Sequence, residues 1–161
     1  MDQNTPISKF MTRELITFKS GEDIWDVLKT IVKSKISGAP VVDDKGNLIG
    51  MLSEADCIKV ILEIHDNRPG GNGTVSDYMN RDVRTLTSDK TLIEVAYAFA
   101  NYSFKRFPVV DDGKLVGQIS RSDVLRAISK LSPDIKIVPN SWQPRVPVLE
   151  PSKRGRHTGN S

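Results

Sequence analysis

Cysteine and histidine are scarce in this chain, which has one cysteine and two histidines among its 161 residues. Cys57 has no partner for an intramolecular disulfide, and no cysteine or histidine lies near it at a spacing typical of metal ligands. His65 and His157 are too scattered to build a metal or catalytic cluster. These absences exclude a disulfide-stabilised fold and indicate a reducing compartment, so we expect a cytoplasmic protein.

Long apolar runs and a strong net charge are also absent. No run approaches the ~20 apolar residues that span a bilayer, and the N-terminus lacks the apolar core of a signal peptide, so we expect neither membrane insertion nor secretion. The net charge is only +3, and part of it comes from Lys153, Arg154 and Arg156 near the C-terminus. Because a nucleic-acid binder gathers its basic residues on one folded face, we expect no nucleic-acid partner.

What the chain does contain is an internal repeat with a period of about 68 residues. The segments 7–13, 40–44 and 50–56 return as segments 75–81, 108–112 and 117–123. Self-similarity of this kind predicts two copies of one supersecondary unit, packed so that each covers the apolar face of the other. The predicted organisation is a first repeat over residues 1–66, a Gly/Pro linker over 67–73, a second repeat over 74–132 and an extended Pro-rich tail over 133–161.

Each repeat is predicted to run strand, helix, strand, strand, helix, which makes the fold class α/β (α+β). In the first repeat Ser20, with Asp23 three positions on, predicts the cap of the first helix, and a turn at 44–47 predicts a hairpin. In the second repeat Ser88 is the predicted cap. The predicted strands are 15–18, 39–42, 48–52, 83–86, 107–110 and 115–119.

The predicted helices over 54–66 and 91–103 carry more apolar residues than one buried face requires. A surface helix usually shows one apolar stripe, whereas these two helices are apolar on two sides. One explanation is that the two repeats bury both faces against each other. The other, which we expect, is a homodimer whose interface comes from both helices. The candidate interface residues are Ile58, Ile61, Leu62, Ile93, Ala96 and Ala100.

The motif Gly-x-x-Ser-x-x-Asp occurs once in each repeat, over residues 50–56 and 117–123. The glycine permits close approach of a ligand or of another backbone segment. The serine lies at a predicted helix N-terminus, which favours an anion, and the aspartate one turn later offers acceptors for a ribose diol. The same spacing is close to a capping box, which would only begin the helix. Because both copies follow a predicted strand in register, we expect at least one of them to bind a nucleotide.

The Ser-x-x-Met segments at 8–11 and 76–79, the repeated Pro-Val-Val-Asp-Asp segments and the two Gly-x-x-Ser-x-x-Asp segments together resemble a tandem pair of cystathionine-β-synthase-type (CBS) domains, or Bateman module. The resemblance covers residues 7–131, about four fifths of the chain. It implies two β-α-β-β-α repeats related by a pseudo-twofold axis, with small sheets packed together, helices outside and two clefts between the repeats. Members of this family commonly bind adenosine-containing ligands and use occupancy to regulate a partner or an attached domain.

The resemblance also implies a set of ligand-binding residues in each repeat. An aspartate would hold the ribose, a serine would face the phosphate, and a proline with the backbone near a threonine would border the adenine. In chain order these residues are Thr17, Pro40, Ser53 and Asp56, followed by Thr85, Pro108, Ser120 and Asp123. The expected ligand is AMP, ADP or ATP, and no metal is expected apart from Mg²⁺ bound to the nucleotide.

The two repeats differ in charge near these residues. Lys105 and Arg106 precede the Phe-Pro-Val strand of the second repeat, and Arg121 lies inside its motif, where the first repeat has a serine, a glycine and a glutamate. Three cations would neutralise a phosphate tail, and arginine binds phosphate bidentately, so the cleft of Asp123 is predicted to bind more tightly than that of Asp56. The alternative, in which the basic loop of one repeat serves the cleft of the other, stays open.

These observations predict a stand-alone regulatory module that binds an adenine nucleotide and signals to a separate partner protein. The sequence offers no Ser/His/Asp set, no metal cluster and no carboxylate pair with a plausible general base, so catalysis is not expected. The alternative is a module of the same fold that binds no ligand and acts by dimerising or by docking to a partner.

Overall fold

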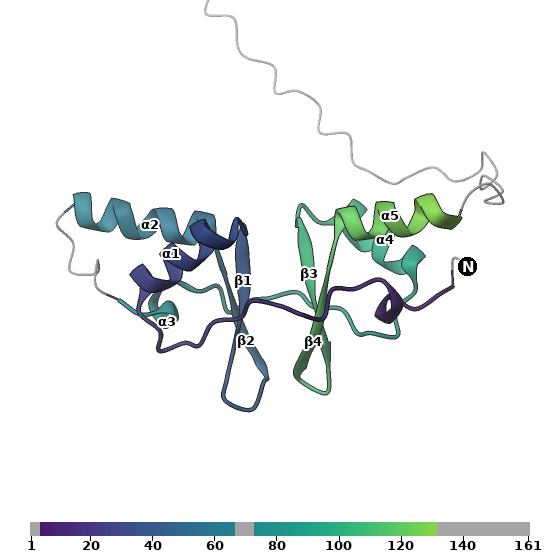
Figure 1. The fold of residues 1–161 in the computed structure, drawn as a ribbon, viewed down its shortest axis with the longest axis horizontal. Helices are drawn as coiled ribbons and strands as arrows, with labels where there is room; N and C mark the ends of the chain where they lie inside the picture. The colour runs from purple at the N-terminus through teal and green to yellow at the C-terminus, as the bar shows by residue number, and fades with distance from the viewer. Residues whose placement is uncertain (1–3, 67–72, 132–161) are drawn as a thin grey trace, which may run out of the picture.

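The computed structural model describes residues 4–66 and 73–131. The predicted tail over 133–161 lies outside these residues, as does the predicted linker except for its last residue, Gly73. Figure 1 shows the described chain as two similar lobes side by side, with a two-stranded antiparallel sheet in each lobe near the centre and helices farther out. The predicted fold class, with helices and small antiparallel sheets, is confirmed.

The two lobes contain the same elements in the same order. The first has α1 (Ile24–Ser34), β1 (Gly38–Val42), β2 (Leu48–Ser53) and α2 (Glu54–His65). The second has α4 (Leu92–Asn101), β3 (Arg106–Asp111), β4 (Lys114–Ser120) and α5 (Arg121–Leu131). A short helix precedes each set in the chain, and the sequence analysis assigns neither of them: the 3₁₀-helix η1 (Ile7–Lys9) and α3 (Val75–Tyr78).

The segment that opens each sequence repeat packs against the other lobe. Near η1, Thr12 exchanges two backbone hydrogen bonds of 2.8 and 2.9 Å with Gln118 of β4. Near α3, Asn80 exchanges two backbone hydrogen bonds of 2.8 and 2.9 Å with Met51 of β2. The packed lobes are therefore not the sequence repeats, because the first lobe is built from residues within 18–80, while the second combines the segment around η1 with the chain from Leu86 onward.

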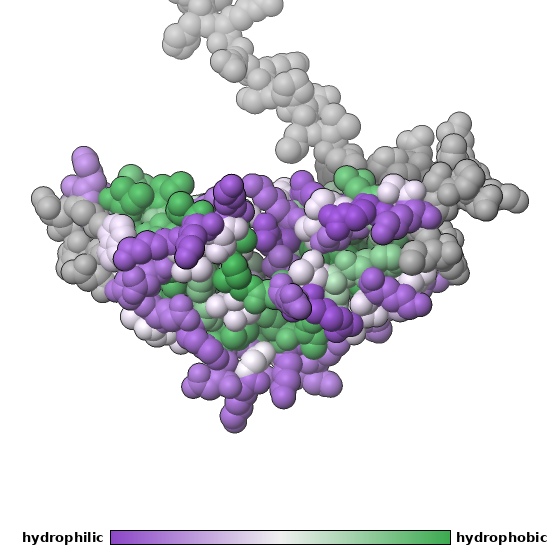
Figure 2. All heavy atoms as spheres, viewed as in Figure 1, coloured by the Kyte–Doolittle hydropathy of each residue, from purple (hydrophilic) through white to green (hydrophobic). Residues whose placement is uncertain are grey.

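Each lobe has its own apolar core, and each core contains side chains from the exchanged segment. Val75 and Met79 pack into the core of the first lobe, and Ile7 and Met11 pack into that of the second. Burying a large aliphatic side chain contributes about 1.5–3 kcal/mol, so the exchanged segments supply a substantial part of each lobe's stability. Outside the cores, apolar side chains stay exposed on α2, at the upper left of Figure 2.

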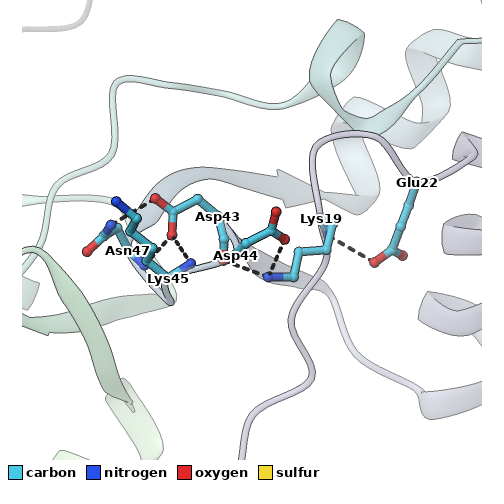
Figure 3. A network of polar contacts seen from close by, with 6 residues as sticks. All are labelled: Lys19, Glu22, Asp43, Asp44, Lys45 and Asn47. Carbon is cyan, nitrogen blue, oxygen red and sulfur yellow. Dashed lines mark hydrogen bonds and ion pairs between the residues drawn. The ribbon is translucent and has the colours of Figure 1, made fainter.

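The hairpin between β1 and β2 forms at the predicted turn. The Asp43 carboxylate accepts hydrogen bonds from the Lys45 N–H at 2.9 Å and from the backbone and side-chain amides of Asn47, each at 2.8 Å (Figure 3). The side-chain bond from Asn47 is the main reason that the pKa of Asp43 lies below its ordinary value. Lys19 Nζ lies 2.6 Å from the Asp43 backbone oxygen and 3.5 Å from Asp44, which ties the segment before α1 to this hairpin (Figure 3).

The two hairpin turns also hold the lobes together. The Leu48 N–H donates to the Gly113 oxygen and the Leu115 N–H donates to the Gly46 oxygen, both at 3.1 Å. In the shorter second turn, Asp112 and Gly113 have φ values of 50° and 81°, which a tight hairpin turn requires. The two interlobe bonds join equivalent positions of the repeats, as a pseudo-twofold axis between the lobes demands.

Two helix caps lie three residues later than predicted. Asp23 rather than Ser20 caps α1, and its carboxylate accepts hydrogen bonds from two N–H groups of the first turn at 2.9 and 3.3 Å. Thr91 rather than Ser88 caps α4. In both helices the cap directly precedes a fully buried aliphatic side chain, so the start of the buried stripe decides which cap residue is used.

The predicted strands over 15–18 and 83–86 are wrong as continuous strands. Each provides one parallel bridge, from Phe18 to Val41 and from Leu86 to Val109. The residues before each bridge lead from one lobe to the other, so they cannot follow a sheet edge within a single lobe. Only the last residue of each run pairs with a strand.

Candidate functional site

Ser53 and Asp56 form a reciprocal cap at the start of α2, directly after β2. Asp56 Oδ2 accepts hydrogen bonds from the N–H and the hydroxyl of Ser53 at 3.0 and 2.7 Å, and the Asp56 N–H donates to that hydroxyl at 3.3 Å. Ser120 and Asp123 repeat this geometry at α5, with distances of 2.9, 2.6 and 3.2 Å. Both motifs therefore act as capping boxes, and evidence for a ligand must come from their surroundings.

Asp56 is a largely buried carboxylate that stays ionised at neutral pH. Burial by itself raises its pKa, but hydrogen bonds from Lys59 and Ser53 outweigh burial and hold the pKa below the ordinary value of 3.8. Lys59 Nζ lies 2.9 Å from Asp56 Oδ1, at the end of a side chain that is 64% exposed. One oxygen of Asp56 belongs to the cap, and the other contacts an exposed lysine that a ribose hydroxyl can displace.

A cavity of about 380 Å³ opens beside Asp56, with walls from both lobes. The first lobe contributes the start of β1, the end of β2 and the first turn of α2. The second lobe contributes the loop between α4 and β3, and the chain that joins the lobes completes the wall. Of the predicted site residues, this cavity brings together Ser53, Asp56, Lys105, Arg106 and Pro108.

The basic loop of the second lobe therefore lines the cavity of the first lobe's aspartate. Lys105 and Arg106 share the wall with Asp56, and Arg106 Nη2 lies 2.6 Å from the hydroxyl of Ser37 across the lobe boundary. This is the arrangement that the sequence analysis left open. It arises because β3 begins at the boundary between the lobes, so that the residues at its start reach the neighbouring cavity.

Arg121 does not share this wall. Its guanidinium donates to the backbone oxygen of Tyr102 at 3.4 Å, and its N–H donates to the Lys105 oxygen at 3.2 Å. Two of the three cations that the sequence analysis assigns to the cleft of Asp123 thus lie in the cavity of Asp56. The charge argument for a stronger Asp123 cleft therefore keeps only Arg121 of its three cations.

The other predicted site residues lie elsewhere. Thr85 lines a second cavity, of about 240 Å³, together with Arg81 and residues of both hairpins. Thr17 is exposed to solvent, and Pro40 is buried in β1, where it pairs with Met51. Neither of these two cavities is lined by Thr17, Pro40, Ser120, Arg121 or Asp123.

The cavity of Asp56 has an aromatic wall that the sequence analysis misses. Phe104 lines the cavity, and its ring lies 5.9 Å from that of Tyr102 in a stacked geometry and 5.5 Å edge-on from the buried ring of Phe107. The Arg84 guanidinium lies 4.5 Å from the centre of the Tyr102 ring. An alignment of the two repeats could have revealed this wall, because Phe104 and Arg84 occupy positions where the first repeat has isoleucines.

The motif glycines serve the exchanged segments rather than a ligand. A Cβ atom on Gly117 would lie 2.8 Å from Met11 Sδ and 2.9 Å from the Thr12 oxygen. A Cβ atom on Gly50 would lie 2.7 Å from Met79 Sδ and 3.1 Å from the backbone oxygen of Asn80. Of the two roles considered for these glycines, close approach of another segment is the one that the structure shows.

Within residues 4–66 and 73–131, no three His, Cys, Asp or Glu side chains form a group that could hold a metal ion. In the same residues, no helix combines the length and apolar character needed to cross a membrane. Cys57 is buried, and burial is the main cause of its raised thiol pKa, so it is not an activated nucleophile.

The two lobes contain the same elements, and in each lobe the last helix, α2 or α5, begins with a Ser-x-x-Asp cap. Together they define a tandem-repeat module with a cavity at the lobe boundary. The family model for the CBS domain matches residues 7–63 and 75–130, so this chain belongs to the CBS domain family as a tandem pair. A relative, the uncharacterized protein MJ1225 of Methanocaldococcus jannaschii, is 34% identical over 125 residues. The match covers 78% of this chain but only 43% of that protein, which is therefore much longer than the shared region.

Solved structures show the same fold with adenosine compounds bound. CBSX2 in complex with AMP has a TM-score of 0.70 and 30% identity, with 78% of this chain and 97% of that chain covered. Another structure of CBSX2 is from Arabidopsis thaliana. The CBS domain pair of protein MJ0100, in complex with 5′-methylthioadenosine and S-adenosyl-L-methionine, has a TM-score of 0.65 and 27% identity, with 80% and 98% covered.

Proposed function

We propose that this CBS pair binds an adenine nucleotide of the AMP, ADP or ATP type in the cavity of Asp56 and, without catalysis of its own, signals occupancy to a separate partner protein in the cytoplasm. The observation that carries the proposal is the union, in one cavity, of the Ser53–Asp56 cap with Lys105 and Arg106. The ligands of the CBSX2 and MJ0100 structures support the adenosine class.

Each part of a nucleotide has a matching group in this cavity. Asp56 offers Oδ1 to a ribose hydroxyl, and the N-terminus of α2 at Ser53 favours an anion. Lys105 and Arg106 supply positive charge for phosphate, and Phe104 and Pro108 supply apolar surface for the base. Any Mg²⁺ would arrive with the nucleotide. Ser120 and Asp123, with Thr17 and Pro40, remain candidates for a second site.

Calorimetric titration with AMP, ADP and ATP tests the proposal. Asp56→Ala should weaken binding by about 1–3 kcal/mol, or roughly five- to 150-fold, because it leaves the ribose hydroxyls unpaired. Asp123→Ala is the matched control, since it removes an equivalent capping box from the other lobe. Equal losses in both variants would contradict the assignment to the Asp56 cavity.

The two cations at the start of β3 predict an order among ligands, even though Glu54 and Asp82 also line the cavity. Affinity should rise from adenosine to AMP and further to ADP or ATP, and it should fall with added salt, because Lys105 and Arg106 attract phosphate. Arg106→Ala should reduce the differences in affinity between adenosine, AMP and ATP. S-adenosylmethionine, whose sulfonium would lie near these cations, should bind poorly, and tight S-adenosylmethionine binding without AMP binding would overturn the nucleotide assignment.

We also propose a homodimer formed through the exposed apolar residues of α2 and α4. Ile58, Ile61 and Leu62 are each more than half exposed, and Ile93 and Tyr97 are exposed on α4. Exposed patches of this kind commonly mark association sites. Light scattering behind a sizing column should give twice the 17.9 kDa chain mass, and Ile61→Asp or Ile93→Asp should give the monomer. Ala96, a candidate from the sequence, packs against the core of the second lobe, so Ala96→Glu would also disturb the fold.

A second candidate function is a dimerisation or docking module that binds no ligand. The capping geometry favours it in one respect, since both Ser-x-x-Asp motifs are satisfied within their own helices. Denaturing the purified protein and identifying released small molecules by mass spectrometry separates the two candidates. Absence of any released adenosine compound, together with no calorimetric signal, would favour the ligand-free module.

A further inference from the structure

The chain that joins the lobes carries two charged residues into the wall of the Asp56 cavity, Asp82 and Arg84. This chain runs between α3 and α4 and crosses from the first lobe to the second (Figure 1). Its two ends are fixed, because Asn80 forms backbone hydrogen bonds with β2 and Leu86 forms a bridge with β3. The backbone that carries Arg84 past the cavity is therefore anchored on both lobes.

Charged residues of both signs line this cavity in equal number. The carboxylates are three and the cations are three, namely Glu54, Asp56 and Asp82 against Arg84, Lys105 and Arg106. Lys59 also balances Asp56, but only until a ribose hydroxyl displaces it. With Lys105 and Arg106 alone, the carboxylates would be in excess, and an excess of negative charge opposes the binding of phosphate. Arg84 is the cation that removes this excess.

Tyr102 holds the Arg84 guanidinium by two contacts. The central carbon of the guanidinium lies 4.5 Å from the centre of the Tyr102 ring, and Nη1 donates a hydrogen bond of 3.0 Å to the Tyr102 hydroxyl. Neither contact involves a carboxylate, so the arginine is oriented while its charge stays available to a ligand. A side chain that is ordered before a ligand arrives also loses less entropy on binding.

The core of the second lobe fixes the tyrosine in turn. The Tyr102 ring stacks on that of Phe104 at 5.9 Å and meets the buried Phe107 ring edge-on at 6.3 Å. Phe104 lines the cavity and Tyr102 does not, so the tyrosine can act on a ligand only through its neighbours. The first repeat has an isoleucine and a serine at the places of Arg84 and Tyr102. This arrangement therefore belongs to the cavity of Asp56 and not to the equivalent cleft.

We propose that Arg84, positioned by Tyr102, binds the phosphate chain of a nucleoside di- or triphosphate in the cavity of Asp56. This inference rests on the proposed nucleotide site and adds a phosphate-binding residue, a positioning residue and the ligand class that they select. A planar guanidinium binds two phosphate oxygens at once. Each added phosphate raises the negative charge of the ligand, so a third cation strengthens the binding of ADP and ATP more than that of AMP.

Calorimetric titration of the full chain with adenosine, AMP, ADP and ATP tests the role of Arg84. Arg84→Met should weaken ATP binding about tenfold and AMP binding by no more than about threefold, and it should leave adenosine binding unchanged. Arg81→Met is the matched control, because Arg81 lies on the same segment but lines the other cavity. It should leave the whole series unchanged. Equal losses for ATP and adenosine in Arg84→Met would overturn the phosphate contact.

A double-mutant cycle tests the role of Tyr102. Tyr102→Phe keeps the ring beside the guanidinium but loses the hydroxyl, so ATP binding should weaken about threefold. Tyr102→Leu removes both contacts and should weaken ATP binding about fivefold, again without an effect on adenosine. In an Arg84→Met background neither change should cause a further loss, because the tyrosine acts through the arginine. Additive losses would overturn the positioning role. Tyr102→Phe keeps the aromatic packing, so it decides the question even if Tyr102→Leu fails to fold.

Failure of this inference and failure of the nucleotide site give different results in the same titrations. A wild-type chain that binds none of the four ligands would overturn both. A wild-type chain that prefers ATP to AMP, with a preference that survives Arg84→Met, would overturn this inference and leave the nucleotide site in place. A wild-type chain that binds AMP as tightly as ATP would overturn the selection of di- and triphosphates.

Discussion

Asp56 uses its two carboxylate oxygens for different purposes. Oδ2 is committed to the Ser53 cap, while Oδ1 contacts only the exposed Lys59 among the hydrogen bonds and ion pairs that the described residues show. A ligand that takes Oδ1 must compete with Lys59, although the cap can stay in place. A single motif can therefore begin a helix and bind a ribose, and the two interpretations of Ser-x-x-Asp do not exclude each other.

We expect Lys59→Met to tighten nucleotide binding a few-fold, because it removes an exposed ion pair that competes for Asp56 Oδ1. Calorimetric titration measures the change. Arg126→Met, which removes the equivalent partner of Asp123, should have little effect if the Asp56 cavity is the principal site. Weaker binding by Lys59→Met would mean that the lysine contacts the ligand instead.

Gly117→Ala should destabilise the fold by about 1–3 kcal/mol, because the new methyl group meets Met11 and a backbone oxygen at less than 3 Å. Gly21→Ala is the matched control, since no atom lies within 4 Å of its added Cβ and its φ is ordinary. Urea unfolding measures both. Equal stability of the two variants would show that the η1 segment does not pack against Gly117 in solution.

The elements with strong local signals are the ones that the sequence predicts well. The first hairpin forms at the turn predicted over 44–47, and the second forms between the predicted strands 107–110 and 115–119, because turn residues with positive φ act locally. The helix caps are harder, since Ser20 and Asp23 are both good cap residues. Packing decides between them: Asp23 caps the helix because Ile24, directly after it, is fully buried.

The cap of α4 makes this helix sensitive to acid. Glu94 accepts a backbone hydrogen bond from Thr91, the main cause that lowers its pKa to about 2, with further help from Lys90. A carboxyl with a lower pKa in the folded state stabilises the fold above its unfolded pKa, and this stabilisation is lost as pH falls from 4.5 toward 2. Stability of Glu94→Gln should therefore fall less steeply than wild type over this range in urea titrations, and parallel curves would contradict the assignment.

The arrangement of the whole molecule is the part that the repeat pattern could not predict. Periodicity within a repeat shows which faces are buried, but it does not show which loop meets which cavity. Lys105 and Arg106 are adjacent to the second repeat's own strand, and their sequence position alone pairs them with Asp123. Only the packing of the lobes brings them to the cavity of Asp56.

Two fragments of nearly equal length test the composition of the lobes. Residues 13–80 contain the whole core of the first lobe, including Val75 and Met79, whereas residues 1–66 contain the first sequence repeat without them. The fragment 13–80 should show a cooperative thermal transition, and 1–66 should not, because it lacks two core side chains. Circular dichroism melting compares them, and a cooperative transition in 1–66 would contradict the role of the exchanged segment.

The exchange also sets an order of events during synthesis. A chain leaving the ribosome completes the first lobe once residue 80 has emerged, since all of that lobe's core lies within one continuous stretch. The segment around η1 emerges before the first lobe, yet its binding site on β4 and α4 is translated only after that lobe is complete. Ile7 and Met11 must therefore stay unburied through most of translation, so the growing chain exposes a short apolar tether that chaperones or a second nascent chain can bind.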